Sequence, residues 1–129
     1  MTYDSAGLQR LKIGSNKTLL GVGAHAGIQA MGLFIDGGAC NVIVLNLTLS
    51  DINPRVVCGG NAFTLEDADD VWVDHDTFAR VGRQMIVTGW GSATHVTMSN
   101  SEFDGRTPTR RPVMVTITGY GCFSAITTP

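Results

Sequence analysis

Val42-Ile-Val-Leu-Asn46-Leu-Thr-Leu49, Val71-Trp-Val-Asp-His75-Asp-Thr-Phe78 and Val96-Thr-Met-Ser-Asn100-Ser-Glu-Phe103 are three copies of one pattern. Their shared form is Val-x-(Val/Met)-x-(Asn/His)-x-(Thr/Glu)-(Leu/Phe), and 29 and then 25 residues separate the first positions of successive copies. An irregular repeat in this length range indicates a solenoid, in which each repeat packs only on its neighbours.

Within each copy the apolar residues alternate as they do in a short strand with one buried face. The inward-facing pairs are Val42 with Val44, Val71 with Val73, and Val96 with Met98. Further strand-like pieces lie between the copies, and no helical period of useful length separates them. The chain is therefore predicted to be all-β, with strands stacked in parallel on their copies as a partial parallel β-helix of few coils.

The same alignment places Asn46, His75 and Asn100 at one corner of successive coils. Stacked side chains at such a corner can bond to each other and to the turn backbone. This repeat gives the three residues a structural role, and none of the three histidines, His25, His75 and His95, is assigned to chemistry.

Length and composition limit the other possibilities. A chain of 129 residues with 43% hydrophobic and 16% charged residues fits one folded domain. Its formal net charge of −2 gives no electrostatic footprint for nucleic acid or an anionic membrane, so neither partner is expected.

The start, Met1-Thr-Tyr-Asp-Ser5, lacks the features of a signal peptide. Cys40, Cys58 and Cys122 fit no zinc motif, and no metal or cofactor is expected.

Several separated motifs, in order, resemble the fungal pectin lyase family. They are Thr2–Gly7, Ser15–Gly23, Leu45–Pro54, Gly59–Leu65, Val71–His75 and Ala79–Gln84. The resemblance runs over about residues 2 to 106 and corresponds to the middle of such an enzyme. It implies a right-handed, single-stranded parallel β-helix at residues 1–106, a secreted protein, and eliminative cleavage of methyl-esterified galacturonan in pectin.

The resemblance also implies which residues form the site. Removing a proton next to an ester carbonyl needs a base, and positive charge where the enolate develops. Gly82-Arg83-Gln84 matches the family's arginine motif, where the related pectate lyases have a calcium-binding aspartate. Arg83 and Asn61 are therefore the expected catalytic residues, Arg83 and Cys58 the expected substrate contacts, and calcium is not expected.

Two departures from the family pattern lower the expected activity. The family usually has Trp-Gly-Gly-Asp where this chain has Cys58-Gly-Gly-Asn61, so a cleft aromatic and a carboxylate are both replaced. The arginine thought to act as base in the family has no counterpart in the chain. We therefore expect a pectin lyase-like polypeptide that is inactive by itself. The alternative is a non-catalytic β-solenoid with at most weak carbohydrate binding.

The tail, residues 107–129, does not contain the repeat. Family members continue after Phe103-Asp-Gly105 with a stretch like Ser-Ala-Thr-Cys-Asp-Gly-Tyr-His-Tyr-Trp. A shifted frame reads the last base of one codon together with the first two bases of the next. From Thr109 to Thr118, codons that fit the present residues can encode all ten family residues in this shifted frame. This coincidence predicts a one-base frame shift near Thr107 or Pro108. A solenoid without polar caps is also predicted to associate end to end.

Overall fold

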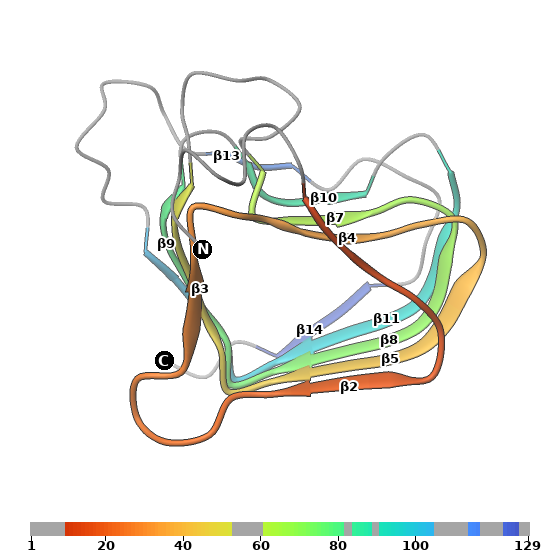
Figure 1. Cartoon of the computed structure of the whole chain (residues 1–129). Helices are drawn as coiled ribbons and strands as arrows, with labels where there is room; N and C mark the ends of the chain where they lie inside the picture. Colours follow the sequence, from red (N-terminus) through yellow and green to blue (C-terminus); the bar gives the residue numbers. More distant parts are fainter. Residues whose placement is uncertain are drawn as a thin grey trace.

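The computed structural model describes residues 10–52, 61–81, 84–88, 91–104, 114–116 and 123–126, the last two as backbone alone. Three parallel sheets form the walls of a solenoid, and each coil adds one strand to each wall in turn (Figure 1). No helix occurs in these described ranges. The prediction of an all-β parallel solenoid is confirmed. No helix of the described chain is long and apolar enough to cross a membrane.

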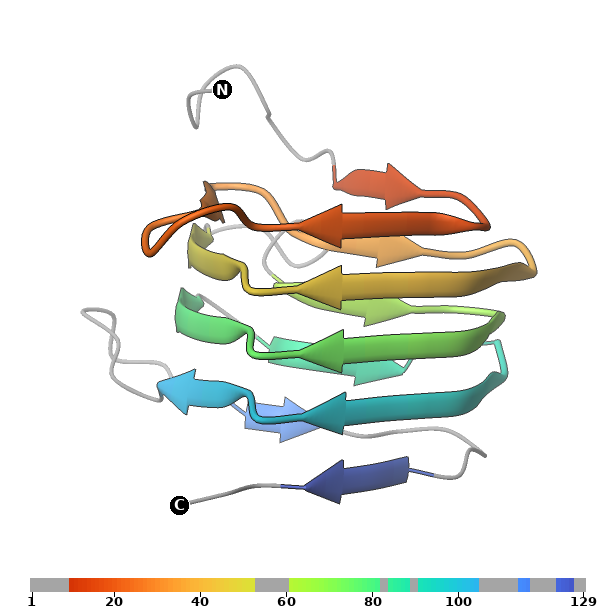
Figure 2. The ribbon, with the colours of Figure 1, turned by 90° about the horizontal axis from the view of Figure 1, so that it is seen from below.

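The strands are named here by wall. Sheet A contains β1 (Leu11–Ile13), β4 (Leu33–Ile35), β7 (Phe63–Leu65), β10 (Gln84–Thr88) and β13 (Met114–Thr116). Sheet B contains β2 (Lys17–Leu20), β5 (Ala39–Leu45), β8 (Ala68–Asp74), β11 (Ala93–Ser99) and β14 (Phe123–Ile126). Sheet C contains β3 (Gly27–Gln29), β6 (Thr48–Ile52), β9 (Thr77–Val81) and β12 (Glu102–Asp104). Figure 2 shows the coils stacked along the solenoid axis.

The register of sheet B reproduces the sequence repeat. Val71 pairs with Val42 on one side and with Val96 on the other, so the three copies lie directly above one another. The predicted inward-facing residues are all buried, from 0% exposed at Val42 to 7% at Met98. Because each strand places its apolar face over that of its neighbour, the interior is a set of continuous apolar columns.

The predicted corner is confirmed by backbone geometry. Asn46, His75 and Asn100 have φ values of 55°, 55° and 47°, in the left-handed region that turns the chain between β-strands. The side-chain amide of Asn46 donates to the backbone carbonyl of Gly21 at 2.9 Å, which is the predicted bond to turn backbone. Gly21 holds the equivalent place one coil earlier, where a Cβ would lie 1.9 Å from the Asn46 carbonyl oxygen. Glycine is therefore required at that position.

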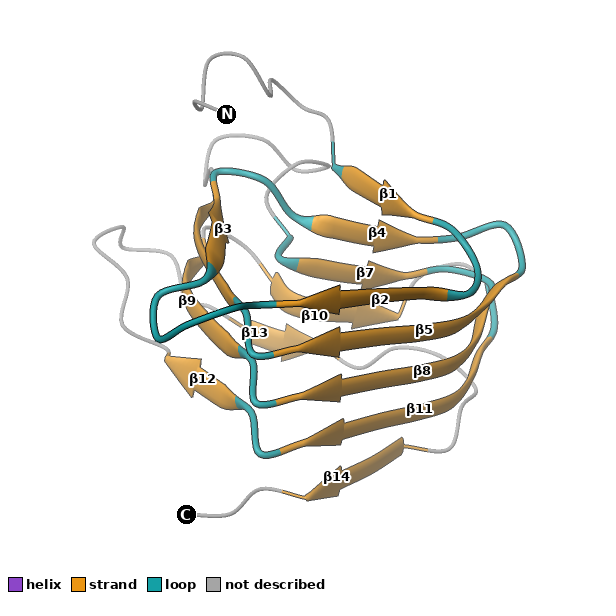
Figure 3. Ribbon diagram, turned by 60° about the horizontal axis from the view of Figure 1, so that its bottom comes forward, coloured by secondary structure: helices purple, strands orange, loops and turns teal. Residues whose placement is uncertain are grey.

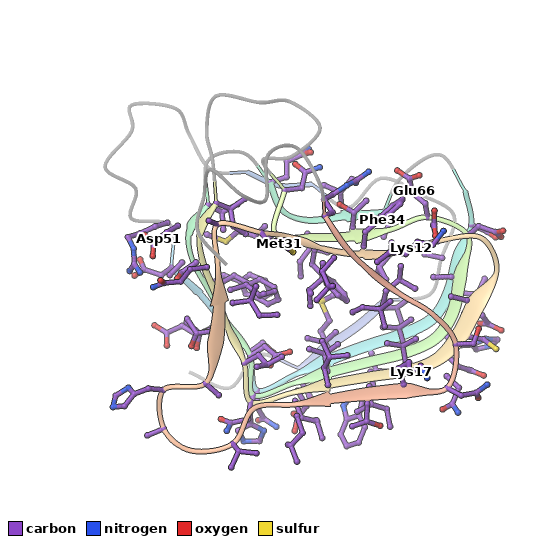
Figure 4. The ribbon with its side chains drawn as sticks, in the orientation of Figure 1. Lys12, Lys17, Met31, Phe34, Asp51 and Glu66 are labelled. Carbon is purple, nitrogen blue, oxygen red and sulfur yellow. The ribbon has the colours of Figure 1, made fainter. Side chains whose placement is uncertain are left out.

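The structure extends the repeat one coil toward the N-terminus. Lys17 pairs with Val42 and Leu19 with Val44, so β2 is a further copy that the shared sequence form did not reveal. Among the described strands β2 forms one edge of sheet B, which leaves Lys17 exposed (Figure 4). A lysine in the column that elsewhere holds valine disfavours pairing of this edge with another chain.

Two short strands lie within the stretch predicted to be out of frame. β13 pairs in parallel with β10, and β14 pairs in parallel with β11 from Val96–Phe123 to Ser99–Ile126. Figure 3 shows β14 beside β11 at the end of sheet B. The proposed origin of the tail stays a prediction, because strand pairing of the backbone does not reveal the reading frame.

Candidate functional site

The outer face of sheet A is the candidate site, because one of the three expected site residues lies at its edge. Along this face Lys12, Phe34, Thr64 and Val87 are in register on four neighbouring strands. Phe34 and Thr64 each lie between two buried apolar residues, and Lys12 and Val87 each adjoin a buried isoleucine, while Thr64 is itself only 1% exposed. The alternation of the short strands thus directs one residue per coil outward.

Cations and an aromatic ring meet on this face. The guanidinium carbon of Arg10 lies 3.9 Å from the centroid of the Phe34 ring, within the range of a cation–π contact. The Lys12 ammonium lies 2.6 Å from a carboxylate oxygen of Asp36. Figure 4 shows Lys12, Phe34 and Glu66 gathered along this wall. Sequence reasoning missed Arg10, Lys12 and Phe34, although the alternation of their strands was a signal that could have found them.

Asn61 lies just before β7 and is buried, with 6% of its surface exposed. Its side-chain oxygen is enclosed and has no hydrogen-bond partner among the described residues. A buried polar atom without a partner costs free energy, so the enclosed oxygen of Asn61 calls for a further hydrogen-bond donor.

Asn61, just before β7, and Gln84, the first residue of β10, belong to neighbouring coils of the solenoid. The backbone N–H of Ala62 donates to the carbonyl of Gln84 at 2.9 Å. The two motifs that contain Asn61 and Gln84 therefore lie side by side where β7 and β10 begin. Arg83 and Cys58, the other expected site residues, lie outside the described residues.

The close approach of two strands beside Asn61 depends on glycine. A Cβ added to Gly32 would lie 2.1 Å from the backbone oxygen of Asn61, which is far inside van der Waals contact. The next residue, Leu33, donates its backbone N–H to the Ala62 carbonyl at 2.7 Å. The position of Asn61 is thus set by the backbone of the preceding coil.

The described groups of this wall include hydrogen-bond donors and an aromatic ring. The cations of Arg10 and Lys12 and the amide of Asn61 can donate hydrogen bonds, and Phe34 offers an apolar surface. Cationic side chains are poor metal ligands, so this donor set fits an organic substrate better than calcium.

A group with metal-ligand chemistry lies on a different wall. Ligand atoms of Asp69, Asp70 and His95 lie within 4.8 Å of one another on sheet B. The Asp69 pKa is lowered by a hydrogen bond from the Thr94 hydroxyl and by His95, and the His95 pKa is raised by its contact with Asp69. Sequence spacing missed this cluster because His95 joins the aspartates only through coil stacking.

Among the described residues, one acidic side chain is buried in the interior. Asp76 is 1% exposed, and burial raises its pKa to about 6. One of its carboxylate oxygens accepts a hydrogen bond from the Leu47 N–H, while the other is enclosed and has no partner in the part of the chain that the structure describes. Asp76 lies away from the outer face of sheet A, at the corner between β8 and β9, and it affects stability.

Comparison with known proteins shows the family of the chain. A family model described as pectate lyase matches residues 3–110. The chain is 51% identical over 106 residues to "Probable pectin lyase F-1" of Aspergillus terreus, covering 82% of this chain and 27% of that protein. It is 51% identical over 105 residues to "Probable pectin lyase E" of Aspergillus fumigatus, covering 81% and 27%. It is 49% identical over 107 residues to "Pectin lyase B" of Emericella nidulans, covering 83% and 28%. The chain thus spans about a quarter of the length of these relatives.

Proposed function

Because this chain belongs to the pectate lyase family, we propose that the protein containing it cleaves methyl-esterified galacturonan by β-elimination. The similarity to three fungal proteins named pectin lyases, at 49% to 51% identity, supports an esterified substrate. The resemblance of Gly82-Arg83-Gln84 to the arginine motif supports the same choice.

One backbone hydrogen bond supports assigning the proposed function to particular residues. The bond from the Ala62 N–H to the Gln84 carbonyl joins the segment after Cys58 to the segment after Arg83. Motifs that are more than twenty residues apart in sequence are therefore neighbours where β7 and β10 of sheet A begin. This proximity supports a shared role for Asn61 and Arg83 in holding the substrate.

In the proposed reaction a base removes the proton from the carbon next to the ester carbonyl. The electron pair moves through an enolate to form a carbon–carbon double bond, and the bond to the glycosidic oxygen breaks. Arg83 is proposed to stabilise the negative charge of the enolate, and Asn61 to orient the ester by its amide. Neither role needs a metal ion.

The alternative function is a non-catalytic solenoid that binds carbohydrate weakly. The replacement of a carboxylate by Asn61 favours it, since a neutral amide cannot hold a neighbouring arginine by charge. This alternative predicts binding of pectin without any unsaturated product.

The test places this segment in a complete relative. Residues 2–106 would replace the matching segment of pectin lyase B from Emericella nidulans, and elimination of highly esterified pectin would be followed by the ultraviolet absorbance of the unsaturated product. We expect a slow steady rise that is lost in Arg83→Ala and unaffected by a chelator.

Arg80→Ala is the matched control. Arg80 lies three residues before Arg83, on sheet C, where its guanidinium forms two bonds to the Asp51 carboxylate at 2.5 and 2.8 Å. Its removal should leave the rate unchanged. A chimera without product, or equal rates for Arg83→Ala and the unmodified chimera, would rule out the proposed role of this segment.

We extend the proposal to location and assembly. A protein that degrades a plant cell-wall polymer acts outside the cell, and the family resemblance supports secretion. The exposed edges of a solenoid favour end-to-end association of this chain in isolation. Sedimentation of the purified chain tests this, and a monomer at all concentrations would contradict it.

A further inference from the structure

A groove on the outer face of sheet B, on a different wall from the candidate site, has the form of a second binding site. It has a volume of about 330 Å³, and its outward-facing residues come as pairs from three neighbouring strands. These pairs are Asn41 and Ile43 of β5, Asp70 and Trp72 of β8, and His95 and Thr97 of β11. Figure 3 shows the three strands side by side. We propose that this groove binds the uncharged sugar rings of methyl-esterified galacturonan and tethers the polymer to the protein.

Trp72 provides the apolar surface of the groove. It is 44% exposed, although tryptophan is usually largely buried. Its indole N–H donates to the Ser99 hydroxyl at 3.1 Å, and that hydroxyl donates to an Asp74 oxygen at 2.5 Å. The ring is therefore held in one orientation before any ligand binds. A preorganised aromatic ring binds with little loss of side-chain entropy.

Ile43 and Thr97 flank Trp72 above and below. Ile43 pairs with Trp72 in the β5–β8 register, and Thr97 pairs with Trp72 in the β8–β11 register. Neighbouring parallel strands lie about 4.8 Å apart, so the three side chains form a platform about 10 Å long. The apolar faces of sugar rings can lie along such a platform, with an isoleucine methyl surface next to the indole.

The second column supplies polar groups. Asn41, Asp70 and His95 have φ values of 58°, 51° and 48°, which place a bend in each strand beside the platform. Amide, carboxylate and imidazole groups along one edge of an aromatic platform can bond to sugar hydroxyls. The groove thus combines one apolar surface with a small number of polar groups, which is the usual composition of a small-molecule site.

Charge selects an uncharged ring over an ionised one. The carboxylates of Asp69 and Asp70 lie at the polar edge, with side chains 47% and 66% exposed. The His95 imidazole is 2.7 Å from Asp69 and 3.8 Å from Asp70, so one imidazole, which carries at most one positive charge, faces two carboxylates. The remaining negative charge repels a galacturonate carboxylate, whereas sugar hydroxyls can donate to it. A methyl ester removes the repulsion.

The choice of this polymer rests on the proposed function, but the binding itself does not need catalysis. Sheets A and B form different walls of the solenoid (Figure 1). The sugar rings bound at sheet B are therefore on a different wall from Asn61, which lies just before β7 of sheet A. The groove is proposed to tether polymer and not to take part in elimination.

The experiment titrates the full 129-residue chain with two hexagalacturonates, one fully methyl-esterified and one unesterified, by isothermal calorimetry. We expect binding of the esterified probe, and at least about tenfold weaker binding by Trp72→Ala, because aromatic anchors contribute a large share of binding energy. Leu20→Ala is the matched control, because Leu20 is 60% exposed on the same sheet and is not part of the groove. It should bind as the unmodified chain does.

Asp70→Asn tests the charge argument. Asparagine keeps the size of the side chain and tolerates the positive φ of 51°. We expect this variant to gain affinity for the unesterified probe, and so to discriminate less between the two probes. Circular dichroism and melting of each variant would show that it is folded.

Five results would overturn the proposal. The first three are no binding of the esterified probe by the folded chain, equal binding by Trp72→Ala, and unchanged discrimination in Asp70→Asn. The fourth is a dimer that Trp72→Ala converts to monomer, which would assign the groove to a second copy of the chain. The fifth is tighter binding of a lysine-rich peptide than of the esterified probe, which would assign the groove to a cationic ligand. The chimera assay tests the site on sheet A independently of the groove. A chimera without elimination would therefore not contradict binding of the esterified probe at sheet B.

Discussion

The carboxylate of Asp76 accepts a hydrogen bond from the backbone N–H of Leu47, one coil away, at 2.7 Å. The two residues occupy the same place in successive copies of the repeat, and both are buried, at 1% and 8% exposure. A position that holds an apolar residue in one coil thus holds an acidic residue in the next. This difference between the copies places a titratable group inside the corner of the solenoid.

Asp76 makes stability depend on pH. Burial raises its pKa from 3.8 to about 6 in the folded chain, so the folded state holds the proton more tightly than the unfolded state. The resulting stabilisation is complete below pH 3.8 and is lost as the pH rises through 6, a change of at most about 3 kcal/mol. Asp76→Asn should remove this loss, as measured by urea unfolding between pH 4 and pH 8.

Asp74→Asn is the control of opposite sign. Its hydrogen bond from the Ser99 hydroxyl lowers the Asp74 pKa, so its stabilisation is present above pH 3.8 and falls in acid. Asp74→Asn should therefore lose stability at neutral pH. If the stability of Asp76→Asn depends on pH as that of the unmodified chain does, ionisation of Asp76 does not destabilise the folded state, and the prediction is wrong.

The stacked pair Phe78 and Phe103 should be important for stability. Their ring centroids are 5.1 Å apart with an interplanar angle of 6°, and Phe78 is fully buried. Phe78→Ala removes this contact and leaves a cavity, which costs about 3–5 kcal/mol. Chemical denaturation measures the loss. Val22→Ala is the control because Val22 is 84% exposed, and it should change stability by less than about 0.5 kcal/mol.

Gly32→Ala should disturb the candidate site through the backbone. The new Cβ would clash with the backbone oxygen of Asn61, so we expect lower stability and a lower elimination rate in the chimera. Gly14→Ala is the control, since nothing lies within 4 Å of a Cβ at that position. Equal rates for the two variants would mean that the position of Asn61 does not matter.

Restoring the family residues should raise the rate of the chimera. Cys58→Trp with Asn61→Asp returns a stacking surface and a charge that can orient an arginine. We expect three ranks: no measurable elimination by the present chain, weak elimination by the chimera, and stronger elimination after both replacements. Each tenfold gain corresponds to about 1.4 kcal/mol of transition-state stabilisation. Equal rates with and without the replacements would contradict the comparison with the family.

The tail gives a prediction about both gene and protein. If residues 107–129 are translated out of frame, their codons spell the family's aromatic segment in the neighbouring frame, and deleting them leaves the melting temperature unchanged. If they form a true cap, deletion exposes β10 and β11, with which β13 and β14 now pair, and the melting temperature falls. Nucleotide sequencing and thermal denaturation of the shortened chain decide between the two.

The sequence by itself determined the solenoid and the register of its central wall. Val42, Val71 and Val96 could be aligned from the printed letters because stacking repeats a local pattern at each coil, and the structure pairs these same residues. The corner at Asn46 was predictable for the same reason. The first copy was missed because Lys17 stands where the pattern has valine.

Only the tertiary structure decided which side chains from different coils face one another. Asp69 and His95 are 26 residues apart, and Trp72 and Ser99 are 27 apart, yet both pairs are in hydrogen-bond contact. Their proximity depends on the lengths of the intervening turns, which local alternation does not specify. The burial of Asp76 and the cation–π contact of Arg10 with Phe34 were decided in the same way, because both arise where separate coils pack together.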